Sequence, residues 1–179
     1  SVYACDTTAR EILSYSVGFG GLLTEHLEIP IIRSQGRMRE MVVLPSATLP
    51  VWNTNQLYAT NFSGNSISTF DVDSSTKMMT AQSPLDATVS IQPEEIAISK
   101  DGTMLYITHP GDATAPLMSV PINPDGSLDT TSATAVAGNN ASFVEIDPSG
   151  DFLYVVDGSG QTLRPYPLDS AGLIGTAGA

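Results

Sequence analysis

Charged side chains that could bind an anion and activate water occur in two short segments of this chain. Arg37, Arg39 and Glu40 lie in the first segment, Glu95 opens the second, and His109 follows it. A guanidinium can bind a carboxylate or phosphate, and a carboxylate or imidazole can serve as a general base. If these residues meet, Arg39 would bind the anion, Glu95 or His109 would be the base, and Glu40 would tune one of them.

The elements that must position these residues repeat along the chain. The pair Leu57-Tyr58 returns as Leu105-Tyr106 and Leu153-Tyr154, with a period of ~48 residues that matches the blade length of β-propellers. A looser copy, Val2-Tyr3, lies upstream. The sequence therefore predicts an all-β chain, a β-propeller of four-stranded antiparallel blades with about four blades present. Tyr58, Tyr106 and Tyr154 should occupy equivalent places in their blades.

Each unit reads as a set of short strands separated by turns. In the third unit the strands are expected at 95–99, 104–108 and 117–122, with Ser127-Leu128-Asp129 beginning a short fourth. The third strand of the last unit contains Pro165 and Pro167. Because proline lacks the N–H that a ladder needs, that strand is expected to be frayed or to lie partly at an edge.

The first unit opens at its second strand, so its inner strand is missing. We expect a single partial propeller over 1–179, with an incomplete blade at 1–31 and blades at 36–80, 93–130 and 141–176. Propeller blades close a ring. Three explanations stay open: the chain is a fragment or nicked half of a longer propeller, a second chain completes the ring, or a small four-bladed ring forms.

Blade geometry predicts where a site would lie. In a four-stranded antiparallel blade, the start of the inner strand and the turn after the second strand fall at the same end. One channel mouth should therefore collect Arg37, Arg39, Glu40, Glu94, Glu95, Ser142, Asp6, Asn61, His109 and Asp157. A pocket there is the default ligand site. The alternative is that Arg39 forms an ion pair with Glu40 or Glu95 around a wet channel. His26 is expected on the surface.

The charge balance excludes two classes of partner. The chain has 7 Lys+Arg against 19 Asp+Glu, a net charge of −12, and such an acidic surface repels nucleic acid and anionic lipid. No stretch approaches ~18 uninterrupted apolar residues, so no transmembrane helix is expected. The single cysteine, Cys5, excludes an internal disulfide and is expected to be buried and inert.

Other motifs add little chemistry. The chain has no paired Cys/His metal signature and no Gly-x-Ser-x-Gly turn, and Asp71-Val72-Asp73 lacks the glycine and distal glutamate of a calcium loop. No cofactor and no metal are therefore expected. Two glycosylation sequons, at Asn61 and Asn140, favour a secreted or extracellular protein slightly. A cytoplasmic location stays open.

Two neighbouring segments carry a resemblance to a known family. Glu95 to Gly102 running into Leu105 to Thr108, followed by Glu145 to Gly150 running into Leu153-Tyr154, resembles successive blades of the lactonase family of seven-bladed propellers. That family includes the bacterial-type 6-phosphogluconolactonases and the fungal carboxymuconate cyclases. The resemblance extends over nearly the whole chain and implies about half of a full propeller.

The resemblance also implies candidate site residues. Where the family's blades often open with a Pro-Arg-His-like element, this chain has Gly36 to Val42, so Arg39 keeps the guanidinium and Glu40 replaces the histidine. The Glu-Ile that opens another blade is kept as Glu95-Ile96. Other positions differ: Asn61-Phe62 stands for Asn-Glu, His109-Pro110 for Asn-Arg, and Ala141-Ser142 for a second Pro-Arg.

Two classes of function follow. The resemblance implies an enzyme, a carboxylic-ester hydrolase or a cycloisomerase, acting without a cofactor on a lactone of an anionic sugar or muconate. Its catalytic residues would be Glu95, His109 and Glu40, and its substrate-binding residues would be Arg39, Arg37 and Asn61. The lost charged groups favour the alternative, a non-catalytic extracellular or cell-surface binding or structural propeller module. Expected partners are a small anionic lactone or carbohydrate, and either the remainder of the propeller or a second chain.

Overall fold

The computed structural model describes most of the chain. The described residues are 2–6, 8, 11–25, 32–33, 38–44, 55–73, 75–76, 78–136 and 140–178. Two residues singled out from the sequence, His26 and Arg37, lie outside this set.

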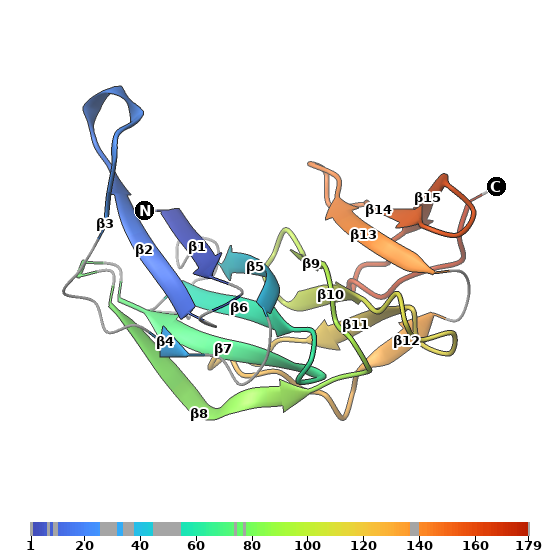
Figure 1. The fold of residues 1–179 in the computed structure, drawn as a ribbon. Helices are drawn as coiled ribbons and strands as arrows, with labels where there is room; N and C mark the ends of the chain where they lie inside the picture. Colours follow the sequence, from blue (N-terminus) through green and yellow to red (C-terminus); the bar gives the residue numbers. More distant parts are fainter. Residues whose placement is uncertain are drawn as a thin grey trace.

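Four antiparallel sheets follow one another along the described chain (Figure 1). The first contains β1 (Val2–Asp6), β2 (Glu11–Val17) and β3 (Leu23–Glu25), with β4 (Ile32–Arg33) also paired to β2. The second contains β5 (Met38–Leu44), β6 (Asn55–Asn61), β7 (Ser66–Val72) and β8 (Met79–Thr88). The third contains β9 (Ile96–Ile98), β10 (Met104–Thr108), β11 (Leu117–Pro121) and β12 (Thr134–Val136). The fourth contains β13 (Ala141–Ile146), β14 (Phe152–Asp157) and β15 (Thr162–Pro167).

Turn chemistry ends the inner strands. After β9, the Asp101 carboxylate accepts hydrogen bonds from the Ser99 hydroxyl and the Thr103 amide, and Gly102 has a φ of 73°. After β13, the Asp147 carboxylate accepts the amides of Gly150 and Phe152. Short aspartate side chains that bond nearby amides, with a glycine in the left-handed region, produce tight turns between antiparallel strands.

Apolar residues on both faces of the third sheet pack against the neighbouring sheets. Leu105 and Ile107 of β10 pack with Tyr58 and Ile67 of the second sheet. Met104 and Tyr106, which alternate with them, pack with the fourth sheet in a separate cluster. Because successive side chains of a strand point to opposite faces, one strand contributes to two interfaces. This is the stacking expected of propeller blades.

The fold predicted from the repeat is confirmed. The chain is all-β except for the short 3-10 helix η1 (Phe19–Gly21) among the described residues, and its first sheet begins with the strand equivalent to the second strand of the others. Tyr58, Tyr106 and Tyr154 sit opposite Val42, Ala97 and Glu145 of their inner strands. The first and fourth sheets stand at opposite ends and do not close on each other (Figure 1). The chain therefore does not form a small four-bladed ring.

One strand differs from its sequence prediction. The fourth strand of the third sheet is β12 (Thr134–Val136), whereas Leu128 forms only an isolated bridge to Ile122. The Asp129 carboxylate accepts the amides of Thr131 and Ser132, and such a local turn competes with strand pairing. Pairing resumes only after that turn.

The proline-containing strand lies at an edge, as expected. β15 is the outermost strand of the fourth sheet, and its Pro165 and Pro167 carbonyls accept the amides of Gly178 and Gly175. The two prolines therefore lack donors only on the side away from β14. Within the described residues, no helix is long and apolar enough to cross a membrane.

Candidate functional site

A β-bulge at the start of β5 positions the first charged pair. The register between β5 and β6 shifts between Met38 and Met41, so Arg39 and Glu40 lie in the irregular part of the strand. The Glu40 amide donates to the Thr60 hydroxyl at 2.9 Å. Bulges re-aim side chains and are common beside functional sites. The irregularity thus fixes how Arg39 and Glu40 are presented at this end of the sheet.

The third sheet begins in a similar way. The Glu94 amide donates to the Thr108 carbonyl at 2.9 Å, and the Thr108 amide donates to the Glu95 carbonyl at 3.0 Å. The Glu95 amide donates to the Thr108 hydroxyl at 3.1 Å. The Thr108 hydroxyl therefore accepts the Glu95 amide, just as the Thr60 hydroxyl accepts the Glu40 amide. The spacing of ~48 residues between the two threonines is the blade period.

The Thr60 hydroxyl also joins the two sheets. It donates to the Glu94 carbonyl at 3.0 Å, and its oxygen lies 3.3 Å from the Glu40 carbonyl. Thr60 is fully buried. A buried hydroxyl with its partners satisfied stabilises one arrangement of the groups it connects. The pairs Arg39-Glu40 and Glu94-Glu95 are thereby held together across the sheet boundary.

Arg39 is anchored but keeps a solvent-facing part. One of its guanidinium nitrogens lies 3.3 Å from a carboxylate oxygen of Glu94, and these side chains are 41% and 25% exposed. The guanidinium carbon lies 4.6 Å from the centroid of the Phe62 ring. Because an exposed ion pair contributes at most about 1 kcal/mol, an anionic ligand could compete with Glu94 for this cation.

Glu95 has a raised pKa in this group. Partial burial raises its pKa, and the negative charges of Glu40 and then Glu94 raise it further, while Arg39 lowers it. A carboxylate with a raised pKa is a better proton acceptor near neutral pH than an ordinary one. The group can therefore combine a general base with an anion-binding cation.

The other two candidate residues, Asn61 and His109, have buried side chains. Asn61 ends β6 and His109 follows β10, and both are fully buried. The Asn61 amide donates to the hydroxyls of Ser66 and Ser68 at 3.1 and 2.7 Å. The first sequon thus lies on a buried asparagine, whereas Asn140 of the second is exposed.

His109 is held by the backbone. Its Nδ1 lies 3.0 Å from the Ile91 carbonyl, so this nitrogen carries the proton in that contact. Burial lowers the pKa of His109, although the Ile91 carbonyl and Asp112 oppose this. Among the described residues, no hydrogen bond or ion pair connects Asn61 or His109 to the four charged side chains. Among the candidate residues that the structure describes, Arg39, Glu40, Glu94 and Glu95 lie in one charged group.

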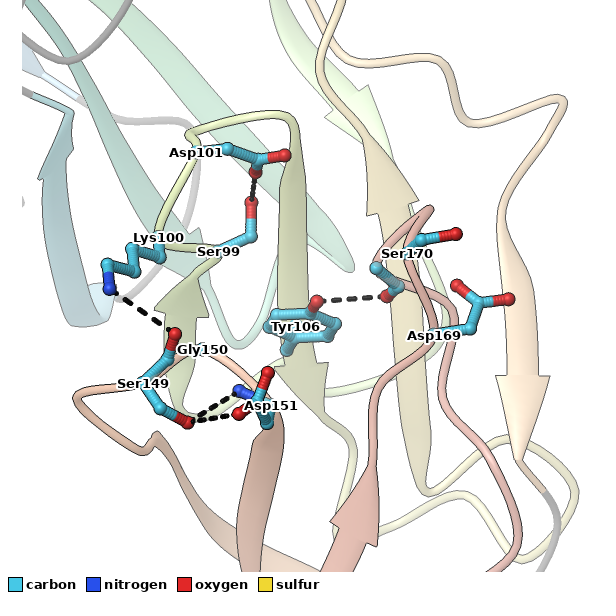
Figure 2. A pocket seen from close by; sticks show the side chains of 10 residues that line it. Ser99, Lys100, Asp101, Tyr106, Ser149, Gly150, Asp151, Asp169 and Ser170 are labelled. Carbon is cyan, nitrogen blue, oxygen red and sulfur yellow. Dashed lines mark hydrogen bonds between the residues drawn. The ribbon is translucent and has the colours of Figure 1, made fainter.

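A groove of about 420 Å³ lies at the opposite end of the sheets (Figure 2). It runs between the turns of the third and fourth sheets, and its polar groups already bond to one another: Lys100 Nζ donates to the Ser149 carbonyl and the Tyr106 hydroxyl donates to the Gly172 carbonyl (Figure 2). Within the described residues, no group of three or more His, Cys, Asp or Glu side chains is arranged to hold a metal ion.

Sequence reasoning missed the residues that organise the charged group. Glu94 was placed at the mouth without a role, and it is the ion-pair partner of Arg39. The sequence analysis gives no role to Thr60 and Thr108, and it notes Phe62 only as a departure from the family pattern. The threonines could have been found, because each stands three residues after the leucine of a repeated Leu-Tyr pair.

Comparisons with known proteins agree with this architecture. The family described as Lactonase, 7-bladed beta-propeller, matches residues 53–178. No curated protein matches the sequence. A protein of Bacteroides uniformis assigned as a 6-phosphogluconolactonase superposes with a TM-score of 0.79 at 16% identity, covering 98% of this chain and 49% of that one.

A second solved structure is also similar to this chain in fold. The periplasmic gluconolactonase of Pseudomonas aeruginosa superposes with a TM-score of 0.76 at 16% identity, covering 99% of this chain and 49% of that one. At such identity the likeness shows the fold alone. The chain spans about half the length of these structures.

Proposed function

Because the chain belongs to the lactonase family of seven-bladed β-propellers, we propose that it acts on a lactone at the end of the sheets where Arg39, Glu40, Glu94 and Glu95 meet. The observation that carries this proposal is the raised pKa of Glu95 beside a partly exposed arginine. The two proteins with similar folds, named as a 6-phosphogluconolactonase and a gluconolactonase, support a lactone as the substrate class.

The proposed reaction is hydrolysis of the ring ester. Glu95 takes a proton from water as the water oxygen attacks the lactone carbonyl carbon. The bond from that carbon to the ring oxygen then breaks, and the ring oxygen receives the proton from Glu95. The product is the open hydroxy acid. Glu40 supports the step because its charge keeps Glu95 basic.

Arg39 is proposed to bind the anionic part of the substrate. A carboxylate or phosphate oxygen would replace the Glu94 carboxylate on the guanidinium, and the Phe62 ring would keep the guanidinium plane in place. A sugar lactone with a phosphate and a muconate lactone both provide such a group. Asn61 and His109 are proposed to support the turns beside the site, since both are buried.

A second candidate function is a non-catalytic binding or structural propeller. The ion pair between Arg39 and Glu94 favours it, because this contact satisfies the cation within the protein. In that case the charged group would line a wet channel without turning over a substrate.

Hydrolysis of a panel of sugar and muconate lactones by the 179-residue chain tests the proposal. Replacing Arg39 with Ala should raise KM for an anionic lactone roughly 10-fold or more, because a charge-assisted hydrogen bond is lost. Glu95→Gln should lower kcat roughly 100- to 10,000-fold with little change in KM.

Lys100→Ala and Asp151→Asn are matched controls, since both residues lie at the opposite end of the sheets and should leave the rates unchanged. Lactone binding without hydrolysis above the buffer rate would favour the binding module. Hydrolysis that survives both Arg39→Ala and Glu95→Gln would contradict the proposed site.

A further inference from the structure

The guanidinium of Arg39 has one charged partner and further donors that face outward. Its Nη1 lies 3.3 Å from Oε1 of Glu94, and no other described carboxylate forms an ion pair with it. The Phe62 ring lies 4.6 Å from the guanidinium carbon and covers one face of the plane. Because a guanidinium has several N–H donors and the Arg39 side chain is 41% exposed, a ligand with two oxygens can bind it from the solvent side.

Arg39 can change partners through a side-chain movement alone. The Glu94 amide donates to the Thr108 carbonyl, and the Glu94 carbonyl accepts the Thr60 hydroxyl. These contacts hold the backbone of Glu94. Its carboxylate, by contrast, has Arg39 as its one ion-pair partner among the described residues. Rotation of the Glu94 side chain therefore frees the guanidinium without a change in the sheets.

The ion pair is weak enough for a ligand to break. Exposed pairs contribute at most about 1 kcal/mol, which is a factor of about 5 in a dissociation constant. An oxyanion that binds two guanidinium nitrogens forms stronger, charge-assisted hydrogen bonds. A neutral group has no such advantage over the Glu94 carboxylate. Ligand anions and Glu94 therefore compete for the same cation.

Other carboxylates surround this cation. Burial raises the pKa of Glu95 most, and the negative charges of Glu40 and then Glu94 raise it further, so the three carboxylates are close enough to interact. Among the described residues, Arg39 is the cation of this group. A further anion is therefore best accommodated while it is bound to Arg39.

Opening of a lactone ring creates such an anion. The ring ester is uncharged, whereas the acid that forms loses its proton to water at neutral pH, because carboxyl groups have pKa values of about 4. The product therefore carries one more negative charge than the lactone. It meets the carboxylates of Glu40, Glu94 and Glu95, and Arg39 is the described cation that offsets them.

We propose that Glu94 competes with ligand anions for Arg39 and thereby promotes release of the acid product. A bound anion displaces the Glu94 carboxylate, and this carboxylate returns to the guanidinium as the product leaves. The role in release rests on the lactone hydrolysis proposed above. The competition does not, because it needs only an anion and the protein. Glu94 acts through Arg39 and forms no bond to the reacting atoms.

Binding of gluconate and of its neutral lactam analogue tests the competition without turnover. Dissociation constants come from backbone amide NMR titrations at one pH and one ionic strength, because salt screens these charges. Glu94→Gln removes the charge and keeps the size of the side chain. It should lower the dissociation constant of gluconate roughly 2- to 5-fold, with a smaller change for the lactam. Damage to the fold would not produce tighter binding of gluconate.

Two controls separate competition from general repulsion between carboxylates. Glu40→Gln removes an equal charge from the same group without breaking the ion pair, so it should tighten gluconate binding less than Glu94→Gln does. In an Arg39→Ala background, Glu94→Gln should leave gluconate binding unchanged, because competition requires both partners. If the chain hydrolyses lactones, inhibition by the acid product should be stronger in Glu94→Gln than in the wild type.

Three results would overturn the proposal. Unchanged or weaker gluconate binding by Glu94→Gln would show that Glu94 does not compete for Arg39. Equal gains from Glu40→Gln and Glu94→Gln, or a gain that persists in Arg39→Ala, would show general repulsion. Unchanged product inhibition in an active Glu94→Gln variant would reject the role in release. Absence of lactone hydrolysis would refute the proposed function and the role in release, whereas gluconate binding would still decide the competition.

Discussion

At the scale of single residues, backbone amides and threonine hydroxyls position the charged side chains. The Thr60 and Thr108 hydroxyls accept the amides of Glu40 and Glu95, so each glutamate is fixed at its backbone while its carboxylate stays available. Partial burial and then the negative charge of Glu40 raise the pKa of Glu95, and we propose that Glu95 is the base and that Glu40 keeps it basic.

Removing the Glu40 charge should make Glu95 more acidic. In Glu40→Gln the pKa of Glu95 falls toward its ordinary value of 4.5, so the acid limb of the kcat/KM profile should move to lower pH. The measurement is a pH–rate profile for lactone hydrolysis. The control is Asp151→Asn, at the opposite end of the sheets. A limb that stays in place would show that Glu95 is not the titrating base.

The same shift affects stability. A carboxyl group whose pKa is raised on folding binds its proton more tightly in the folded protein, so its contribution to the free energy of unfolding falls as pH rises from 4.5 through the raised pKa. Glu95→Gln removes the titrating carboxyl group. The free energy of unfolding of this variant should therefore depend less on pH between 4.5 and the raised pKa of Glu95.

At the scale of elements, the sheets are joined by a repeated contact between a strand and a turn. Gly126 fits only because it has no side chain: a Cβ there would lie 2.6 Å from Gln56, and its φ of 84° strains other residues. Burial raises the pKa of Tyr58 and Tyr106, so both hydroxyls stay protonated as donors.

Tyr58→Phe should therefore destabilise the protein while Tyr154→Phe should not. The first removes a buried hydrogen bond and leaves the Gly126 carbonyl without its donor, which costs about 1–3 kcal/mol. The second changes an exposed hydroxyl. Urea unfolding of the wild-type chain and of the two variants gives the losses to be compared. Equal losses in the two variants would contradict the equivalence of the interfaces.

Most of the strands and turns could be predicted from the sequence. The Leu-Tyr repeat and the Gly and Pro turns place the strands because they are local signals with one period. The position of β12 could not be predicted, because the Asp129 carboxylate accepts nearby backbone amides and the resulting turn delays strand pairing. The hydrogen bond of His109 could not be predicted either, because its partner is the carbonyl of Ile91, 18 residues away in the chain.

At the scale of the whole molecule, the four sheets form an open row (Figure 1). The charged group lies at one end of the sheets between the second and third, and the groove between the third and fourth lies at the other end (Figure 2). Antiparallel topology separates the two ends by the length of the strands. A ligand can therefore be assigned to one end or the other.

Titration with an unreactive lactam analogue of a sugar lactone, followed by backbone amide NMR shifts, tests the central claim most directly. The account predicts shifts at Arg39, Thr60 and Glu95, with Thr60 responding because its hydroxyl bonds the backbones of Glu40 and Glu94. Arg39→Ala should weaken these shifts. Shifts confined to Lys100, Asp151 and Asp169 of the groove, or no shifts at all, would contradict a lactone site at the Arg39–Glu95 end.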